Sequence, residues 1–480
     1  MGLKFGTSGV RGLVTEFTDR EAYLLTTAFL QHANIATPAS NVSVGMDLRE
    51  SSPKILNAIE HALADHKKGI HNCGVLPTPA LAYYSAENKS LAIMVTGSHI
   101  PADRNGIKFY LATGETLKSD DEQIFKNYER LQQENFAKEL FDEEGSLIRK
   151  SAVDTKKASD DAKELFIDRY VKALANHSLK GTKVIFYEHS SAAREYMGSI
   201  LDYLGAQVIR VGRSDQFIPV DTEAVESLDL FKKWISEHNA DALISTDGDG
   251  DRPLVIDNKG RLVQGDKLGI ICSEFLGVEA IALPISCNSG VSKIKEFKKI
   301  IFTKIGSPYV VEALNNLNSE FKSVAGFEAN GGYILSSPVK LATELKSLPT
   351  RDSILPALAI LGMAAKRKCT VADVVDKLPP RFTSSVLAKN CPPEKSAKII
   401  ESVSANPDAF IKSLLPTANV WSKNTLDGLR MTTTSEQVVH LRPSGNAPEF
   451  RCYTEASTQK EADAIAEKAL GKIKEFIQTP

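Results

Sequence analysis

The stretch ALISTDGDGDRPLVID, residues 242–257, joins an apolar run, three aspartates spaced by single glycines, and a second apolar run. The pattern predicts a buried strand over residues 242–246 and a hairpin over residues 252–263, with the acidic loop between them. Loops at the carboxyl ends of parallel strands are the usual ligand sites of α/β folds. The stretch therefore predicts an α/β sheet with a charged site at its edge.

The chain around this stretch alternates short apolar runs with helical segments. KVIFY (183–187), a helix from about residue 190 to 204, and QVIRVG (207–212) make a βαβ unit, and KIIFTKIG (299–306) begins a similar set. Such alternation predicts doubly wound α/β sheets that are covered on both faces. Three segments, HNCGVLPTPA, VIRVGRSD and TKIGSPYV, each put a glycine after a short strand. This loose pattern indicates a triplicated α/β module.

The same patterns predict further elements and four domains. Residues 78–89 are predicted to be a helix with Thr78 as its N-cap and Pro79 at its first position, and residues 91–95 a strand. A charged segment over 143–161 is typical of a domain connection, and a long helix is expected near the end, over 458–477. The expected limits are 1–158, 159–260 and 261–372 for three related α/β domains with mixed sheets, and 373–480 for a C-terminal α+β domain.

Composition limits the classes of function. The formal charge of −2 over 480 residues argues against a nucleic-acid-binding protein. The six cysteines show no CxxC spacing, which is typical of free thiols in a reducing compartment. The N-terminus has no apolar signal region, and the longest apolar run, 354–365, is too short to cross a bilayer. We therefore expect a cytoplasmic protein that binds no membrane.

Asp247, Asp249 and Asp251 are the first candidate site. Three carboxylates so close in sequence repel one another, and a hard divalent cation removes that cost. An EF-hand loop is excluded because its glycine and glutamate positions hold Arg252 and Asn258. A solvated acidic turn is the alternative interpretation.

The second candidate is TGSHIPADRNGIKFY, residues 96–110. It follows a predicted strand and contains Ser98, His99 and Lys108, and Asn105-Gly106 predicts a tight turn. A serine, an imidazole and an ammonium suit a phosphoryl group carried covalently on oxygen. A lone loop serine is more often a turn or cap residue.

Two later loops offer ligand-binding groups. LRPSGNAPEFRCY (441–453) supplies a guanidinium, a hydroxyl and backbone N–H groups, which suit a phosphate cradle or a plain turn between strands; the residues are Arg442, Ser444, Gly445 and Asn446. GFEANGGY (326–333) carries Glu328 and Asn330, which suit sugar hydroxyls. The alternative for this loop is a glycine-rich turn with Asn330 in the left-handed conformation.

Together and in this order, the four loops resemble those of the α-D-phosphohexomutase superfamily, most nearly its bacterial phosphomannomutase/phosphoglucomutase branch. The opening FGTSGVRG (5–12), with Arg11, resembles a family signature, and the resemblance extends to the run at 442–456. It implies four domains around a central cleft. It also implies interconversion of mannose 6-phosphate and mannose 1-phosphate, and of the glucose phosphates, through a phosphoserine and a hexose 1,6-bisphosphate, which also serves as activator.

The resemblance implies a role for each candidate residue. Ser98 is expected to carry the phosphoryl group and, with Asp247, Asp249 and Asp251, to hold Mg2+. The groups expected around the transfer site are Arg11, His99, Lys108 and Arg252, with Lys108 the better candidate for proton transfer. Those expected to bind the sugar and the second phosphate are Lys304, Glu328, Asn330, Arg442, Ser444, Gly445 and Asn446. The expected partner is a hexose phosphate, and the chain is expected to be a monomer or a homodimer.

Several positions depart from the family pattern and leave the substrate open. Ile100, Asn330, Gly332 and Asn446 stand where the family more often has asparagine, serine, histidine and threonine. Phosphoglucosamine mutase is therefore an alternative. An aspartyl-phosphate phosphatase of the haloacid dehalogenase type, with Asp247 as nucleophile, and a non-catalytic sugar-phosphate binder are weaker ones.

Overall fold

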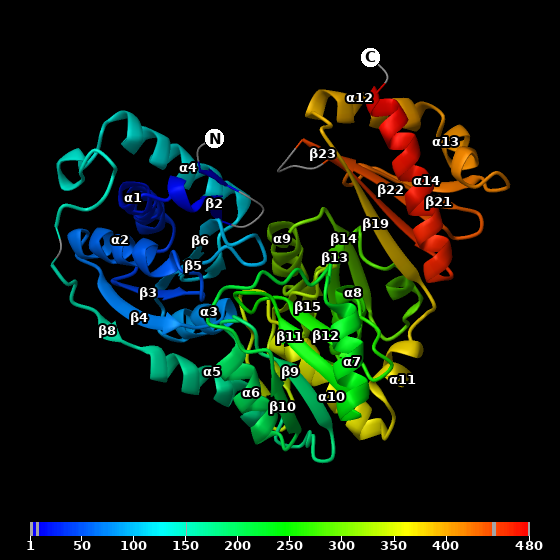
Figure 1. Cartoon of the computed structure of the whole chain (residues 1–480), viewed down its shortest axis with the longest axis horizontal. Coiled ribbons are helices and arrows are strands. Elements are labelled where there is room, and N and C mark those ends of the chain that lie inside the picture. Colours follow the sequence, from blue (N-terminus) through cyan, green and yellow to red (C-terminus); the bar gives the residue numbers. More distant parts are fainter. Residues whose placement is uncertain (1–2, 6–8, 150, 444–447, 479–480) are drawn as a thin grey trace.

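The fold was determined from a computed structural model that describes residues 3–5, 9–149, 151–443 and 448–478. Consecutive parts of the chain lie side by side, from a first unit in blue to a C-terminal unit in orange and red (Figure 1). In the described residues, no helix is both long and apolar enough to span a membrane.

The second unit contains a four-stranded sheet in the order β10-β9-β11-β12. β9 pairs in parallel with both β10 and β11, and β12 runs antiparallel to β11. The strands are β9 (Lys183–Tyr187), β10 (Gln207–Val211), β11 (Ala242–Thr246) and β12 (Pro253–Asp257), and the helices are α5 (Ser159–Ala173), α6 (Arg194–Tyr203) and α7 (Leu228–His238).

The third unit repeats this strand order as β14-β13-β15-β16, again with the last strand antiparallel. Its strands are β13 (Ala280–Pro284), β14 (Lys299–Thr303), β15 (Val324–Phe327) and β16 (Tyr333–Leu335), followed by the small pair β17 (Val339–Lys340) and β18 (Glu344–Leu345). Its helices are α8 (Gly265–Leu276), η3 (Ser289–Lys293), α9 (Ser307–Leu317), α10 (Ile354–Arg367) and α11 (Val371–Asp376).

The first unit has the same order, β4-β3-β5-β6, inside a larger sheet that β2, β1, β8 and β7 extend. The strands are β1 (Lys4–Phe5), β2 (Val10–Leu13), β3 (Asn41–Met46), β4 (Gly69–Val75), β5 (Leu91–Val95), β6 (Arg104–Leu111), β7 (Gly114–Glu115) and β8 (Lys156–Lys157). The helices are η1 (Val14–Glu16), α1 (Asp19–Ala36), α2 (Ser52–Asp65), α3 (Thr78–Glu87), α4 (Lys118–Gln133) and η2 (Lys138–Leu140). The shared strand order confirms the predicted triplication.

The C-terminal unit is α+β, as predicted. Its five-stranded antiparallel sheet has the order β19-β23-β22-β21-β20. The strands are β19 (Phe382–Lys389), β20 (Val420–Asn424), β21 (Leu429–Thr433), β22 (Val438–Pro443) and β23 (Glu449–Ala456), and the helices are α12 (Pro393–Ala405), α13 (Pro407–Leu414) and α14 (Gln459–Gln478).

The three α/β units share one cluster of buried apolar side chains, and the C-terminal unit has its own. One cluster runs through all three α/β units and includes Leu81, Phe166 and Leu358. The C-terminal unit has a separate cluster around Ile411, Phe450 and Ile465. The C-terminal unit therefore does not share the apolar cluster that joins the three α/β units.

Two local predictions were wrong. Asn105 and Gly106 lie inside β6 and do not form a turn. Gly106 is needed there because a Cβ would lie 2.6 Å from the Val10 oxygen and 2.7 Å from the Thr96 oxygen of the two flanking strands. Thr78 is the first residue of α3, and Pro77 is the N-cap. The Thr78 hydroxyl does not cap the helix and donates instead to Asp249 Oδ2, at 2.6 Å.

Candidate active site

The loops predicted to carry chemistry occupy the same position in each α/β unit. Each one joins the third parallel strand to the antiparallel strand: residues 96–103 between β5 and β6, 247–252 between β11 and β12, and 328–332 between β15 and β16. We call them the serine loop, the aspartate loop and the sugar loop. The repeated topology therefore delivers one equivalent loop from each unit to a common site.

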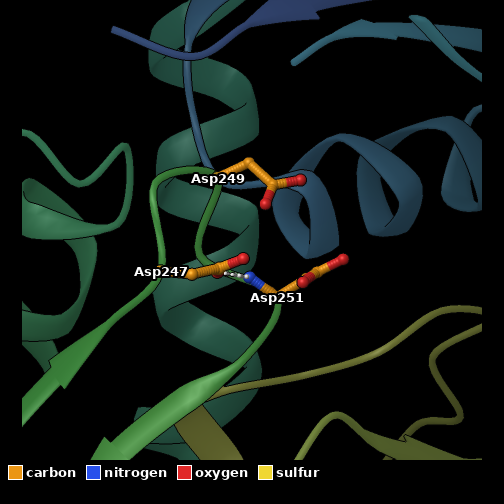
Figure 2. A group of neighbouring side chains, drawn as sticks. All are labelled: Asp247, Asp249 and Asp251. Atoms are coloured by element: carbon orange, nitrogen blue, oxygen red, sulfur yellow. Dashed lines mark hydrogen bonds between the residues drawn. The ribbon is translucent and has the colours of Figure 1, made fainter. Parts of the chain in front are cut away.

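The aspartate loop turns three buried carboxylates to one side. Asp247, Asp249 and Asp251 have no exposed surface, and one oxygen of each lies within 4.8 Å of the others. Figure 2 shows the three side chains and the hydrogen bond, 3.1 Å long, that the Asp251 amide donates to Asp247 Oδ1. The turn requires Gly250, whose φ is +70° and whose Cβ would lie 2.8 Å from Pro77 and 2.9 Å from Ala193. These features exclude a solvated acidic turn.

The oxygens of this loop fit a hard cation. Asp249 Oδ1 and Asp251 Oδ1 are buried and accept no hydrogen bond from the residues that the structure describes. Burial, together with the charges of Asp249 and Asp251, raises the pKa of Asp247 well above its ordinary value. Unpartnered carboxylate oxygens that repel one another are the donor set that Mg2+ prefers.

Fixed cations occupy the other carboxylate oxygens. Lys108 Nζ, on β6, donates to Asp249 Oδ2 at 2.6 Å and to Asp251 Oδ2 at 2.7 Å. Burial opposes the charge on Lys108, but Asp249 and Asp251 outweigh it and raise the pKa of this ammonium. Arg351 Nη2 donates to Asp251 Oδ2 at 2.8 Å, and Arg351 Nη1 to Glu328 Oε1 at 3.2 Å. Sequence reasoning missed Arg351, since nothing local marks an arginine 100 residues from its partner.

Ser98 lies against the aspartate loop in a strained conformation. Its φ is +56°, it is 1% exposed, and its Oγ donates to Asp247 Oδ2 at 2.6 Å. Left-handed backbone at a non-glycine residue costs about 1–3 kcal/mol and persists only where the surroundings hold it. The Ser98 amide donates to Thr96 Oγ1 at 2.8 Å, which helps to hold the turn. The hydroxyl is therefore fixed beside the predicted metal ligands.

Arg49, a second residue that sequence reasoning missed, holds the serine loop. Its guanidinium donates to the backbone oxygens of Ser98, Ile100, Pro101 and Arg104 at 2.6–2.9 Å. It also pairs with Asp47 at 3.2 Å and lies 3.9 Å from the centre of the Phe217 ring. The available signal was the spacing of Asp47 and Arg49 directly after a strand, where α/β proteins place ligand loops.

His99, Arg252 and Arg11 complete the charged surroundings. Arg252 Nη1 lies 2.8 Å from His99 Nδ1, and Ser98 Oγ lies 3.3 Å from the same nitrogen. Burial is the largest cause that lowers the pKa of His99, and the positive charges of Arg252 and Arg11 lower it further, to about 2. The ring is therefore neutral at physiological pH. Burial also lowers the pKa of Arg11, and repulsion by Arg252 and Arg351 adds to this effect, so that the pKa is about 10. A group of cations this dense suits a dianionic ligand.

The sugar loop is only partly as predicted. Glu328 is buried and bound to Arg351, and the Asn330 side-chain oxygen accepts the Gly332 amide at 2.9 Å. The left-handed residue is Gly331, with φ +85°, and not Asn330. Lys304 is exposed after β14, with its Nζ 5.8 Å from the centre of the Tyr309 ring.

Of the four residues predicted to bind the second phosphate, the structure describes Arg442. Its Nε donates to Asp427 Oδ1 at 3.0 Å, and Asp427 Oδ2 accepts the Ile305 amide at 2.9 Å. Ser444, Gly445 and Asn446 lie outside the described residues. A cavity of about 320 Å³ lies between the second, third and C-terminal units, and its lining includes Thr222, Asp266, Ala329, Arg430 and Tyr453.

Four family models match the chain in order. They describe phosphoglucomutase/phosphomannomutase α/β/α domains I, II and III, at residues 2–135, 166–260 and 264–382, and the C-terminal domain, at 388–472. A phosphomannomutase from Salmonella muenchen is 40% identical over 98% of this chain and 96% of its own length. A phosphoglucosamine mutase from Clostridium botulinum is 29% identical over 97% of each chain. A solved phosphoglucomutase/phosphomannomutase family protein from Burkholderia thailandensis has a TM-score of 0.76, 17% identity and 98% coverage of both chains.

Proposed function

Because this chain belongs to the phosphoglucomutase/phosphomannomutase family of α-D-phosphohexomutases, we propose that its aspartate, serine and sugar loops form the active site of a phosphohexomutase. The enzyme is an isomerase that interconverts mannose 6-phosphate and mannose 1-phosphate through a phosphoserine and a hexose 1,6-bisphosphate. The observation that carries the residue assignment is the 2.6 Å hydrogen bond from Ser98 Oγ to Asp247, beside Asp249 Oδ1 and Asp251 Oδ1, which accept no hydrogen bond from the part of the chain that the structure describes.

Ser98 is the residue that carries and returns the phosphoryl group. In the first transfer the bond from phosphorus to the serine oxygen breaks and a bond to a sugar hydroxyl oxygen forms, while the proton of that hydroxyl ends on the released serine oxygen, which becomes a hydroxyl again. The bisphosphate then reorients, and its other phosphoryl group returns to Ser98. The strained loop that Arg49 holds presents the serine oxygen in one position for both transfers.

The charges around Ser98 stabilise the transfer. Mg2+, when bound by Asp247, Asp249, Asp251 and the oxygen on Ser98, offsets the charge of the carboxylates and of the phosphoryl group. Arg11, Lys108 and Arg252 supply positive charge that needs no reorganisation during the reaction. His99 is neutral, and its Nδ1 accepts a hydrogen bond from Arg252, which holds that guanidinium near the serine oxygen. Lys108 is held as an ammonium by two carboxylates, so it serves better as a proton donor than as a base.

We assign the binding of the sugar and of the phosphate that does not react to the two other predicted loops and Lys304. Glu328, Asn330 and Lys304 read the sugar hydroxyls, and Arg442 with Ser444, Gly445 and Asn446 holds the second phosphate. Glucose and mannose differ only at C2, so contacts to the other hydroxyls accept both, and we expect glucose phosphates to react as well. Hexose 1,6-bisphosphate is the activator that restores phosphorylated Ser98 after loss to water.

The test measures kcat/KM for mannose 1-phosphate and glucose 1-phosphate with Mg2+ and a trace of hexose 1,6-bisphosphate, beside Ser98→Ala. We expect turnover that Ser98→Ala abolishes, while Ser98→Ala still binds the substrate. Near-wild-type turnover by Ser98→Ala would falsify the phosphoserine mechanism. Turnover of glucosamine phosphate alone would favour phosphoglucosamine mutase instead. Covalent phosphate on Asp247 would indicate the aspartyl-phosphate mechanism.

A further inference from the structure

We propose that Arg351 is a positioning residue that fixes the aspartate loop and the sugar loop relative to each other. Its charge also limits the affinity of the aspartates for Mg2+. This inference rests on the proposed function of the aspartate loop. It goes beyond that function by giving a role to an arginine outside all the loops predicted to carry chemistry.

One guanidinium joins the two loops. Arg351 lies between β18 and α10, and its side chain is 4% exposed. Its Nη2 donates to Asp251 Oδ2 at 2.8 Å, and its Nη1 to Glu328 Oε1 at 3.2 Å. Since the guanidinium is planar and rigid, the two carboxylates cannot shift relative to each other without loss of one bond. Glu328 also keeps only its second oxygen for a ligand.

The backbone leaves the arginine little freedom to move. Asp352, the next residue, exchanges two backbone hydrogen bonds with Tyr333, which fixes Arg351 beside Gly332. A Cβ at Gly332 would lie 2.6 Å from Arg351 Cδ and 2.9 Å from its Cγ. The absence of a side chain at residue 332 is therefore what allows the guanidinium to reach both loops.

The same contact works against a metal ion. Asp251 Oδ2 already accepts Lys108 Nζ and Arg351 Nη2, so part of its charge is compensated before any cation arrives. Removal of the Arg351 charge increases the negative potential at the triad, which favours Mg2+. It also releases Glu328, which weakens sugar binding. Loss of Arg351 thus changes the two affinities in opposite directions, which a general loss of structure does not do.

The experiment titrates Mg2+ alone into the full-length protein by calorimetry and measures KM for glucose 1-phosphate and mannose 1-phosphate. For Arg351→Met we expect an Mg2+ Kd about tenfold lower and a KM about tenfold higher than for the wild type. Arg351→Lys keeps the charge but reaches one carboxylate, so its Mg2+ Kd stays within about threefold of the wild-type value while its KM rises.

The matched control is Arg169→Met. Arg169 is a buried arginine that pairs with Asp352 at 3.3 Å, and its other side-chain hydrogen bond goes to the Lys346 oxygen. We expect it to lower stability and leave the Mg2+ Kd unchanged. A wild type that binds Mg2+ while Arg351→Met binds it equally or more weakly overturns the role of Arg351. A wild type that binds no Mg2+ contradicts the metal site itself.

A steric variant keeps the inference testable if Arg351→Met does not fold. Gly332→Ala forces the arginine side chain to move, so we expect a KM about tenfold higher than wild type. In an Arg351→Ala background the space is open, and Gly332→Ala should change KM less than twofold further. A wild-type KM for Gly332→Ala, or equal effects in both backgrounds, overturns the proposal.

Discussion

At the scale of single residues, the site depends on buried charges that are matched across units. The three aspartates are fully buried; Asp249 and Asp251 pair with Lys108 from the first unit, and Asp251 also pairs with Arg351 from the third. Removing one partner of a buried ion pair typically costs 3–5 kcal/mol, because the other charge stays buried. Each of these residues therefore matters to both stability and chemistry.

Gly250 gives the first test at this scale. Gly250→Ala combines left-handed strain at φ +70° with contacts of 2.8 Å and 2.9 Å to Pro77 and Ala193. We expect a loss of about 2–4 kcal/mol in unfolding free energy and weaker Mg2+ binding, measured by urea titration and calorimetry. Gly277→Ala is the control, because Gly277 has φ +65° but open space around it, and should lose about 1 kcal/mol. Equal losses would show that the contacts do not matter.

Arg49 gives the second test. Arg49→Lys keeps the charge, but one ammonium cannot bind four backbone oxygens that surround a planar fork. We expect kcat to fall by about 10–100-fold, since a small displacement of a reacting oxygen has that effect. The measurement is kcat together with the rate at which labelled phospho-Ser98 loses phosphate to water, which should rise. If both rates match the wild type, the serine loop does not depend on this arginine.

The parts of the site formed by neighbouring residues could be predicted from the sequence, and the contacts between distant residues could not. The aspartate and serine loops could be predicted because their residues are neighbours in the chain, and the strands before them end where α/β folds bind ligands. Thr78 and Arg351 could not be assigned because their partners are distant, 171 residues away for Thr78 and Asp249. Arg49 lies near its partner Asp47 in the sequence, but the four backbone oxygens that it binds are 49–55 residues away. The turn predicted at Asn105-Gly106 was wrong because close strand packing, which no local pattern reveals, also selects glycine.

At the scale of elements, β22 buries a histidine, His440, two residues before Arg442. His440 is 1% exposed, its Nε2 lies 2.6 Å from the Asp427 oxygen, and its Nδ1 has no partner among the described residues. Burial lowers the pKa of His440 to about 4, well under its ordinary value of 6.5. Protonation of this ring therefore lowers the stability of the fold.

The pH dependence follows from that pKa. Between pH 6.5 and 4 the unfolded chain binds a proton at residue 440 that the folded chain does not, so stability falls as pH falls through this range. The full effect is about 3 kcal/mol. We expect the urea midpoint of the wild type to fall more steeply over this range than that of His440→Gln, whose amide can also donate to Asp427. Parallel pH curves would contradict the assignment.

At the scale of the whole molecule, the C-terminal unit is held to the third unit by polar contacts. Asp427 accepts the Ile305 amide from the third unit and Arg442 Nε from its own. Since the two units have separate cores, such contacts set how the predicted phosphate loop faces the other loops. Polar contacts between domains also break and form readily, which suits a site that opens to exchange substrate.

Asp427→Leu should disconnect the two units at this point. Without a carboxylate, both the Ile305 amide and Arg442 lose their partner, and we expect KM to rise about tenfold while kcat changes less. Lys293→Ala is the control, because the ion pair of Lys293 and Glu436 also joins these units but is about half exposed, and should change KM less than twofold. A KM equal to that of the wild type would remove Asp427 from the binding site.

The charge matching across units also has a consequence for synthesis. The nascent chain leaves the ribosome in order, so Lys108 is already folded into the first unit when the three aspartates emerge. Arg351 follows only after another 100 residues have been added. The second unit thus completes its sheet with Lys108 and its own Arg252, but not Arg351, in place as counter-charges. A fragment of that unit alone would keep Arg252 beside the three carboxylates but would lack both Lys108 and Arg351, so its aspartate loop would be short of counter-charge when expressed in isolation.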